Sequence, residues 1–312
     1  MLQIASIGEC MVELAASSPT TYQRGYAGDT FNAAVYCARA LTTFNNPSIV
    51  IEYVTALGDQ DAFSQGIETL CHAEHLGTTL IRHLPGRLPG LYLIETDPTG
   101  ERHFHFYRSE APARDLFAGP EGLLLCEALL EKDVWYFSGI LLAILKPESR
   151  TRFLDYLKRA YDKGIQLYFD LNYRARLWDQ GEARAVVSPI FPYLTGILPS
   201  FEEEQALFGD ATPAETLERY RTQGIHDIVV KDGAKGYWLW EQAAQHYPVQ
   251  PAPRVIDTTA AGDSFNGTYL AYRLTGHSPT VAATNAACIA KHVVQYRGAI
   301  TPLFNPLLQE TP

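Results

Sequence analysis

The stretch VIDTTAAGDSFNG at residues 255–267 places small residues and one carboxylate where a strand is expected to pass into a helix. Val255 and Ile256 predict the end of the strand, and aromatic residues follow at helical spacing. The first turn of a helix has backbone N–H groups without intrahelical partners, and small side chains let an anion approach them. We therefore expect Ala260, Ala261 and Gly262 to form an anion-binding turn.

Asp263 follows this turn directly. A carboxylate beside an anion site repels the anion unless it has another task, such as taking a proton from an attacking hydroxyl. Backbone donors that stabilise a moving phosphoryl group, together with a base for the acceptor, predict phosphoryl transfer. The alternative is plain capping, because a Thr-x-x-Gly-Asp run also begins helices for capping and dipole reasons alone.

The elements around this turn predict a doubly wound α/β fold with a mainly parallel sheet. Short β-branched or aromatic runs, such as residues 134–139, 165–170 and 226–231, alternate with helical patterns. Residues 90–110 break this rhythm, since they alternate with period two on both sides of a turn at 97–100 and so predict a hairpin. We expect one domain over 1–312, with a small β-sheet lid built from inserted segments at about 9–26 and 87–110.

Composition excludes several classes of protein. The net charge of −10 over 312 residues opposes a broad nucleic-acid-binding face. The five cysteines are widely spaced and form no C-x-x-C pair, which favours reduced thiols in a cytoplasmic protein. The N-terminal residues lack the pattern of a signal peptide, and no stretch of 18 uninterrupted apolar residues predicts a membrane span.

Two motifs resemble signatures of the ribokinase-like (PfkB) carbohydrate kinase family. DTTAAGDSFNG resembles the C-terminal signature, and GYAGDTFNAAVYCARAL at 25–41 resembles the N-terminal Gly-x-x-x-Asn signature. The likeness continues through IGECMVEL, LPGLYLIETDPTGER, NYRARLW, VVKDGAKG and QYRGAI, and it covers essentially the full chain. The resemblance implies an ATP- and Mg²⁺-dependent sugar kinase, and these strings favour phosphorylation of a 2-keto-3-deoxy sugar acid at its 6-hydroxyl.

The resemblance also implies a role for each matching residue. Asp263 is implied as the catalytic base, and the N–H groups of Ala260, Ala261 and Gly262 as the anion hole. The implied substrate residues are Gly28, Asp29, Asn32, Tyr92, Phe106, Arg108, Arg174 and Asp263. The implied nucleotide residues are Asn172, Arg174, Lys231, Gly233, Lys235, Gly236, Ala260, Ala261 and Gly262. Glu203 is implied to hold magnesium through water, although Ser200 stands where the family's Asn-x-x-Glu pattern has asparagine.

Each of these residues also has a structural interpretation. Asp29 could serve as the N-cap of the helix that follows it, the VVKDGAKG loop could be an ordinary glycine turn with solvated lysines, and the glutamates at 202–204 could simply favour a helix start.

Arginine suits an acid substrate because its planar guanidinium pairs with a carboxylate in a bidentate manner. Arg108 on the hairpin and Arg174 in the main body are the candidate carboxylate readers, with Arg176 as a nearby alternative. A neutral-sugar kinase and a sugar-sensing protein without turnover remain the other hypotheses. The exposed edges of the hairpin predict a homo-oligomer, as a dimer through the lids.

Overall fold

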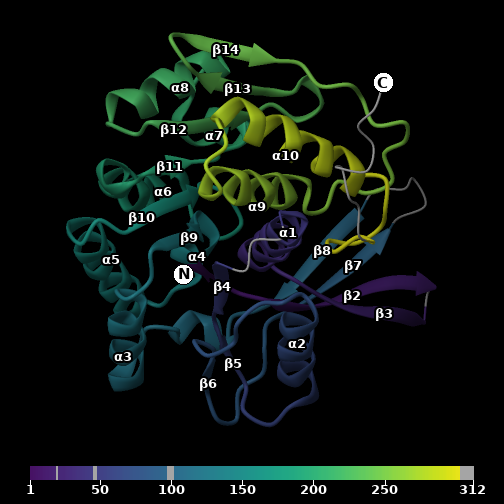
Figure 1. Cartoon of the computed structure of the whole chain (residues 1–312). Helices are drawn as coiled ribbons and strands as arrows, with labels where there is room; N and C mark the ends of the chain where they lie inside the picture. The colour runs from purple at the N-terminus through teal and green to yellow at the C-terminus, as the bar shows by residue number, and fades with distance from the viewer. Residues whose placement is uncertain (19, 45–47, 97–101, 303–312) are drawn as a thin grey trace.

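The computed structural model describes residues 1–18, 20–44, 48–96 and 102–302. Among these residues, the larger sheet has eight strands in the order β14-β13-β12-β11-β10-β9-β1-β4 (Figure 1). The strands from β12 to β4 pair in parallel, whereas β13 and β14 join one edge antiparallel. The strands are β1 Leu2–Ile7, β4 Ile49–Val54, β9 Val134–Ser138, β10 Gln166–Asp170, β11 Gly196–Ile197, β12 Asp227–Lys231, β13 Tyr237–Trp240 and β14 Ala244–Tyr247.

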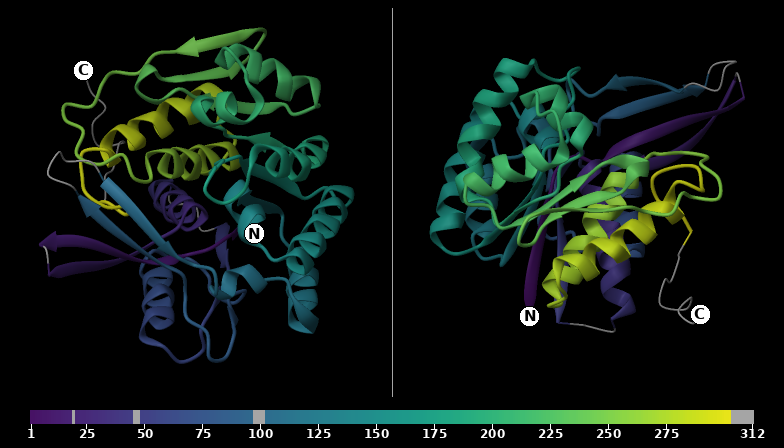
Figure 2. Two further views of the ribbon diagram at one scale, coloured as in Figure 1. Left: turned by 180° about the vertical axis from the view of Figure 1, so that it is seen from behind. Right: turned by 90° about the horizontal axis from the view of Figure 1, so that it is seen from above.

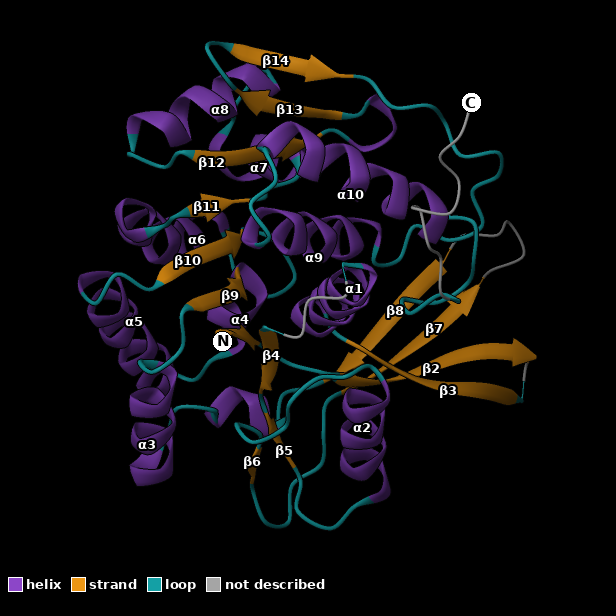
Figure 3. Cartoon of the chain, in the orientation of Figure 1, coloured by secondary structure: helices purple, strands orange, loops and turns teal. Residues whose placement is uncertain are grey.

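Helices cover both faces of this sheet (Figure 3). The parallel strands are runs of apolar residues because both of their faces are buried, as β9 illustrates: Trp135 and Phe137 join one core, and Val134 and Tyr136 join the other. One layer comprises α3 Gly119–Leu129, α4 Gly139–Ile144, α5 Pro147–Asp162, α6 Gln180–Val187, α7 Phe201–Phe208 and α8 Pro213–Thr222. The other comprises α1 Asp29–Thr43, α2 Ala62–Ala73, α9 Ala261–Leu274 and α10 Pro279–Val293. The doubly wound α/β prediction is confirmed.

A second sheet of four strands projects from one side of this body (Figures 1 and 2). Its order is β3-β2-β7-β8, with β2 and β7 parallel and the two outer pairs antiparallel. The rings of Tyr92, Phe104 and Phe106 share one face, with centroids 5.6 to 6.3 Å apart. The expected hairpin and small sheet are present, and the turn at 97–100 lies outside the described residues. The strands are β2 Met11–Ser18, β3 Thr21–Ala27, β7 Leu91–Thr96 and β8 Arg102–Tyr107.

The prediction that a strand ends at Val255 and Ile256 is wrong. Residues 251–260 form no strand and belong to none of the described sheets, and the side chains of Val255 and Ile256 are 64% and 43% exposed. Instead, the backbone N–H of Ile256 donates to the carbonyl of Val294, just past the end of α10. The remaining short elements are β5 Ala56–Leu57, β6 Arg82–His83, η1 Pro112–Asp115, η2 Ser188–Tyr193 and η3 Gly233–Lys235.

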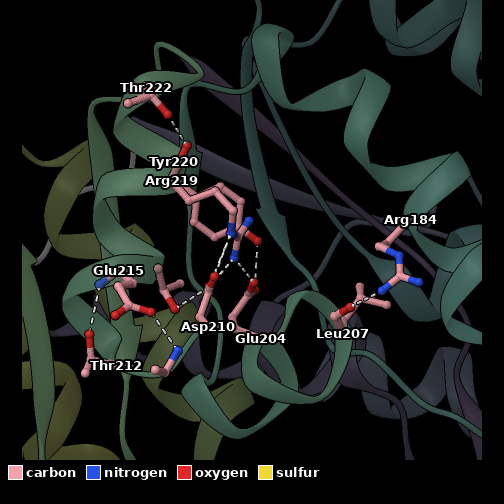
Figure 4. A network of polar contacts seen from close by, with 11 residues as sticks. Arg184, Glu204, Leu207, Asp210, Thr212, Glu215, Arg219, Tyr220 and Thr222 are labelled. Carbon is pink, nitrogen blue, oxygen red and sulfur yellow. Dashed lines mark hydrogen bonds and ion pairs between the residues drawn. The ribbon is translucent and has the colours of Figure 1, made fainter.

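A buried ionic network fixes α7 against α8 (Figure 4). The guanidinium of Arg219 donates to Glu204 at 2.5 Å and to Asp210 at 2.7 Å, and the hydroxyl of Tyr220 donates to Glu204 at 2.8 Å. Glu204 is fully buried, and burial raises its pKa to about 7 despite the arginine. The network matters for function because the first turn of α7 borders a cleft between the main body and the small sheet.

Candidate active site

A cleft of about 1000 Å³ lies between the main body and the small sheet. It opens at the carboxyl ends of β10 and β12, where ligands of open α/β sheets usually bind. Residues from α1, β7, β8, the start of α7 and the start of α9 line it. The residues implied by the sequence that the structure brings together here are Gly28, Asp29, Asn32, Tyr92, Phe106, Asn172, Arg174, Glu203, Lys231, Ala260, Ala261, Gly262 and Asp263.

Within the described ranges, three helices begin at this cleft without a side-chain cap. These are α1, α7 and α9, whose N-cap residues are Gly28, Ser200 and Ala260. By contrast, α2, α4, α6, α8 and α10 are capped by a side chain, whereas α3 and α5 begin with proline in the first turn and have no side-chain cap. Because backbone N–H groups at an uncapped start need acceptors, the cleft favours anionic ligands. The plain capping interpretation of the α9 motif therefore lacks its expected hydrogen bond.

Backbone strain accompanies the α9 start. Ala260 has a left-handed conformation with φ of 59°, which is unfavourable for a residue with a Cβ. The preceding loop is held by Asp257, whose carboxylate accepts from the Thr259 N–H at 2.9 Å and from the Gly298 N–H at 3.0 Å. Strain that is held in place by its surroundings is typical of functional sites.

Asp263 lies in the first turn of α9, beside α1. Asn32 on α1 donates its side-chain amide to the Asp263 carboxylate at 2.8 Å. Burial, and next the Asp29 carboxylate, raise the pKa of Asp263 to about 7. A carboxylate with such a pKa is suited to accept a proton from a hydroxyl near neutral pH.

Asp29 is the first residue of α1, and Gly28 rather than Asp29 is the N-cap. The side-chain amide of Asn172 donates to Asp29 at 3.2 Å, and burial raises the pKa of Asp29. Gly28 is required for packing, because a Cβ at this position would lie 1.9 Å from the backbone oxygen of Glu9. The absence of a side chain at Gly28 therefore allows the backbone at Glu9 to pack closely against it.

The arginines are placed differently from one another. Arg174 lines the cleft and pairs with Glu203 at 2.7 Å, while burial raises the pKa of Glu203 to about 7. Arg176 also lines the cleft and donates to the backbone oxygen of Phe104 at 3.2 Å, so it joins the main body to the small sheet. Arg108 does not line this cleft, because its guanidinium is directed to buried Glu9.

The loop after β12 is divided. Lys231, the last residue of β12, is buried in the cleft. Gly233, Lys235 and Gly236 do not line it, and the Lys235 side chain is 75% exposed beside Asp232. These three residues stay implied nucleotide residues without a contact to the cleft.

Sequence reasoning missed Asp170, the last residue of β10. It is 4% exposed, lines the cleft, and its Oδ1 atom has no hydrogen-bond partner within the described residues. Its position at the carboxyl end of a buried parallel strand was the available signal.

Comparison with known proteins identifies the family. The sequence model of the pfkB family carbohydrate kinase matches residues 1–305. The chain belongs to the PfkB family. It is similar to the 2-dehydro-3-deoxygluconokinases of Escherichia coli (strain K12) and Dickeya dadantii (strain 3937), at 41% and 40% identity, each covering 96% of this chain and 97% of the relative. The resemblance noted in the sequence is confirmed.

Solved structures support the PfkB fold. That of 2-dehydro-3-deoxygluconokinase from Thermotoga maritima has a TM-score of 0.81 at 21% identity and covers 97% of both chains. That of a ribokinase II from E. coli with ATP and Mg²⁺ has a TM-score of 0.82 at 21% identity, covering 96% of this chain and 94% of the other. Within the described part of this PfkB chain, no helix is long and apolar enough to cross a membrane.

Proposed function

We propose that this chain is an ATP-dependent sugar-acid kinase. It transfers the γ-phosphoryl group of ATP to the 6-hydroxyl of 2-keto-3-deoxygluconate and gives 2-keto-3-deoxy-6-phosphogluconate. The observation that carries the proposal is an uncapped helix start beside Asp263, whose pKa of about 7 suits a general base. The acceptor is inferred from the 41% identity to the E. coli 2-dehydro-3-deoxygluconokinase.

In the proposed reaction, the sugar hydroxyl lies against Asp263. Its carboxylate accepts the hydroxyl proton as the oxygen attacks phosphorus, and Asn32 keeps the carboxylate in place through the 2.8 Å hydrogen bond. The N–H groups of Ala260 and Gly262 stabilise charge on the transferred group. The N–H of Ala261 donates to the carbonyl of Thr258 at 3.2 Å and joins them if this bond opens. Asp29 and Asn172, which are bonded to each other, provide polar atoms for sugar hydroxyls.

The proposed cofactors are ATP and Mg²⁺. Two buried carboxylate oxygens in the cleft, Glu203 Oε2 and Asp170 Oδ1, have no hydrogen-bond partner within the described residues, and such oxygens suit a magnesium ion that keeps several waters. The described residues contain no group of three or more His, Cys, Asp or Glu that would hold a metal by themselves. The ion would therefore be shared with the phosphates, whose charge it neutralises when bound.

The acid group of the substrate needs a cation, and among the described residues Arg174 and Arg176 are the arginines that line the cleft. Arg108 and Arg174 do not by themselves favour a sugar acid over a neutral sugar, because Glu9 and Glu203 already pair with them. The case for a sugar acid over a neutral sugar therefore rests on the sequence relatives.

We also propose that the small sheet acts as a lid, which would exclude water and limit hydrolysis of ATP. Tyr92 and Phe106 present aromatic rings from this sheet to the cleft. A homodimer through the lids and a cytoplasmic location, where ATP is available, complete the proposal. A solution mass of one chain at micromolar concentration, measured by sedimentation, would overturn the dimer.

The deciding experiment is coupled ADP release with ATP and Mg²⁺ against 2-keto-3-deoxygluconate, 2-keto-3-deoxygalactonate, gluconate, fructose and ribose. We expect turnover with the keto-deoxy acids, abolished in Asp263→Asn. Turnover with fructose or ribose alone would overturn the acid specificity. Sugar binding without turnover in the unmodified protein would favour the sensing hypothesis.

A further inference from the structure

Lys231 is the only lysine that lines the cleft within the part of the chain that the structure describes. We infer that its ammonium group binds the phosphoryl group during transfer, beneath the first turn of α9. The inference rests on the proposed kinase function. It goes beyond the implied place of Lys231 in the nucleotide pocket, because it puts the lysine at the transferred group.

The position of Lys231 supports this role. It ends β12, is 8% exposed, and reaches the uncapped start of α9. A Cβ placed on Gly262 would lie 3.5 Å from the Lys231 ammonium nitrogen. The charged group therefore adjoins the backbone turn that favours an anion, and the two would act on the same ligand.

A buried network holds the ammonium group in place. Lys231 Nζ donates to the side-chain oxygen of Asn266 at 2.9 Å and to Asp170 Oδ2 at 3.3 Å. The amide nitrogen of Asn266 donates in turn to Asp170 at 2.6 Å and to the hydroxyl of Tyr136 at 3.0 Å. All four residues are buried, so their geometry is set by the packing of β9, β10, β12 and α9.

The hydrogen-bond inventory of Lys231 leaves room for a ligand. An ammonium group has three N–H donors, and the network uses two of them. The third is left for an acceptor in the cleft, and a buried charge is costly unless its donors are satisfied. A phosphoryl oxygen is a strong acceptor for it, since charge-assisted hydrogen bonds are shorter and stronger than neutral ones.

The charges in the cleft point the same way. Asp29, Asp170, Asp263 and Glu203 all line it, so a phosphoryl group bound among these carboxyls needs a cation beside it. Arg174 is already paired with Glu203 at 2.7 Å. Lys231 is also paired, with Asp170 at 3.3 Å, but its ammonium nitrogen adjoins the α9 turn, because a Cβ on Gly262 would lie 3.5 Å from it.

During transfer, the substrate O6 forms a bond to the γ-phosphorus as the bond from that phosphorus to the β,γ-bridging oxygen breaks. The hydroxyl proton moves to the Asp263 carboxylate, and ADP leaves with the bridging oxygen and its electron pair. Lys231 donates a hydrogen bond to an oxygen of the moving phosphoryl group, where charge accumulates.

The test separates the transferred group from the rest of the nucleotide. We expect Lys231→Met to lower kcat with 2-keto-3-deoxygluconate by roughly 10²- to 10³-fold, as loss of one preorganised donor does, while the Kd for ADP by calorimetry stays within about twofold. Retained ADP binding also shows that the variant folds. In Lys231→Ala, ethylammonium should restore part of the lost kcat. Lys158→Met, an exposed position on α5, is the matched control.

Two results overturn the inference. One is a kcat for Lys231→Met close to that of the unmodified protein. The other is ADP binding weakened in parallel with kcat, which would assign Lys231 to the nucleotide pocket or to the fold. If the unmodified protein phosphorylates a different sugar of the panel, the proposed substrate fails, and the same variants are then compared with that sugar.

Discussion

Asp263 should cost the folded protein stability at neutral pH. Burial and the Asp29 carboxylate raise its pKa from the ordinary 3.8 to about 7. Between these values the folded protein keeps a proton that the unfolded chain has released. Asp263 therefore does not reduce the free energy of unfolding below pH 4, and it reduces this free energy progressively as pH rises to 7. Each pH unit within this window is worth about 1.4 kcal/mol, which gives at most about 3 kcal/mol between pH 5 and pH 8.

Asp263→Asn removes this cost and keeps an oxygen for the Asn32 amide. Because Asp263 is only partly shielded from solvent, we expect the variant to gain about 1–3 kcal/mol in free energy of unfolding, relative to the unmodified protein, on going from pH 5 to pH 8. Urea unfolding at both pH values measures it, with exposed Asp59→Asn as the matched control. An equal difference between the two proteins at pH 5 and pH 8 would refute the reasoning.

Three further outcomes are expected. The kcat/KM of the unmodified protein should rise with pH through about 7 as Asp263 ionises. Asp29→Asn should shift this rise in kcat/KM to lower pH, because it removes a negative charge next to Asp263, and an unshifted pH profile would contradict this. Ala260→Gly should leave the free energy of unfolding nearly unchanged, because the relief of backbone strain at φ of 59° offsets the larger conformational entropy that glycine loses on folding. Ala260→Val should lower the free energy of unfolding by about 2 kcal/mol in urea unfolding, and equal effects of the two variants would argue against strain. Arg219→Met should lower the free energy of unfolding by about 3 kcal/mol at pH 8, because it leaves the Glu204 carboxylate buried without its arginine. The decrease should be smaller at pH 6, where Glu204 takes a proton. Adding Glu204→Gln should recover part of the lost free energy of unfolding, and no recovery would contradict the pairing.

Periodicity in the sequence was enough to predict the layers of the fold and the small sheet. Strands such as β9 are short apolar runs, and the hairpin of β7 and β8 alternates cleanly, because burial on two faces or on one leaves different patterns. The strand prediction at Val255 and Ile256 was wrong because β-branched residues favour a strand only where a partner strand exists, and residues 251–260 belong to none of the described sheets.

Within the site, local motifs identified the turn at 260–263 and the residues Asp29 and Asn32, but not the pairings between distant elements. Asp170 and Asn266 meet Lys231 only through the order of strands in the sheet. The engagement of Arg108 by Glu9 likewise joins residues far apart in the chain. No pattern along one segment encodes such contacts, which arise from tertiary packing.

The parallel pairing of β2 with β7 has a consequence for how the molecule assembles. Val12 pairs with Leu91, and the register continues to Ala15 and Ile94, so each hairpin of the small sheet comes from a different part of the chain. Bringing β2 and β7 together closes a long loop, and this is slow because the chain loses conformational entropy before the stabilising contacts form. The small sheet should therefore form late in folding, once the segment between β2 and β7 has brought the two strands together. For the same reason it has no single excisable segment, and a graft onto another scaffold would need both hairpins.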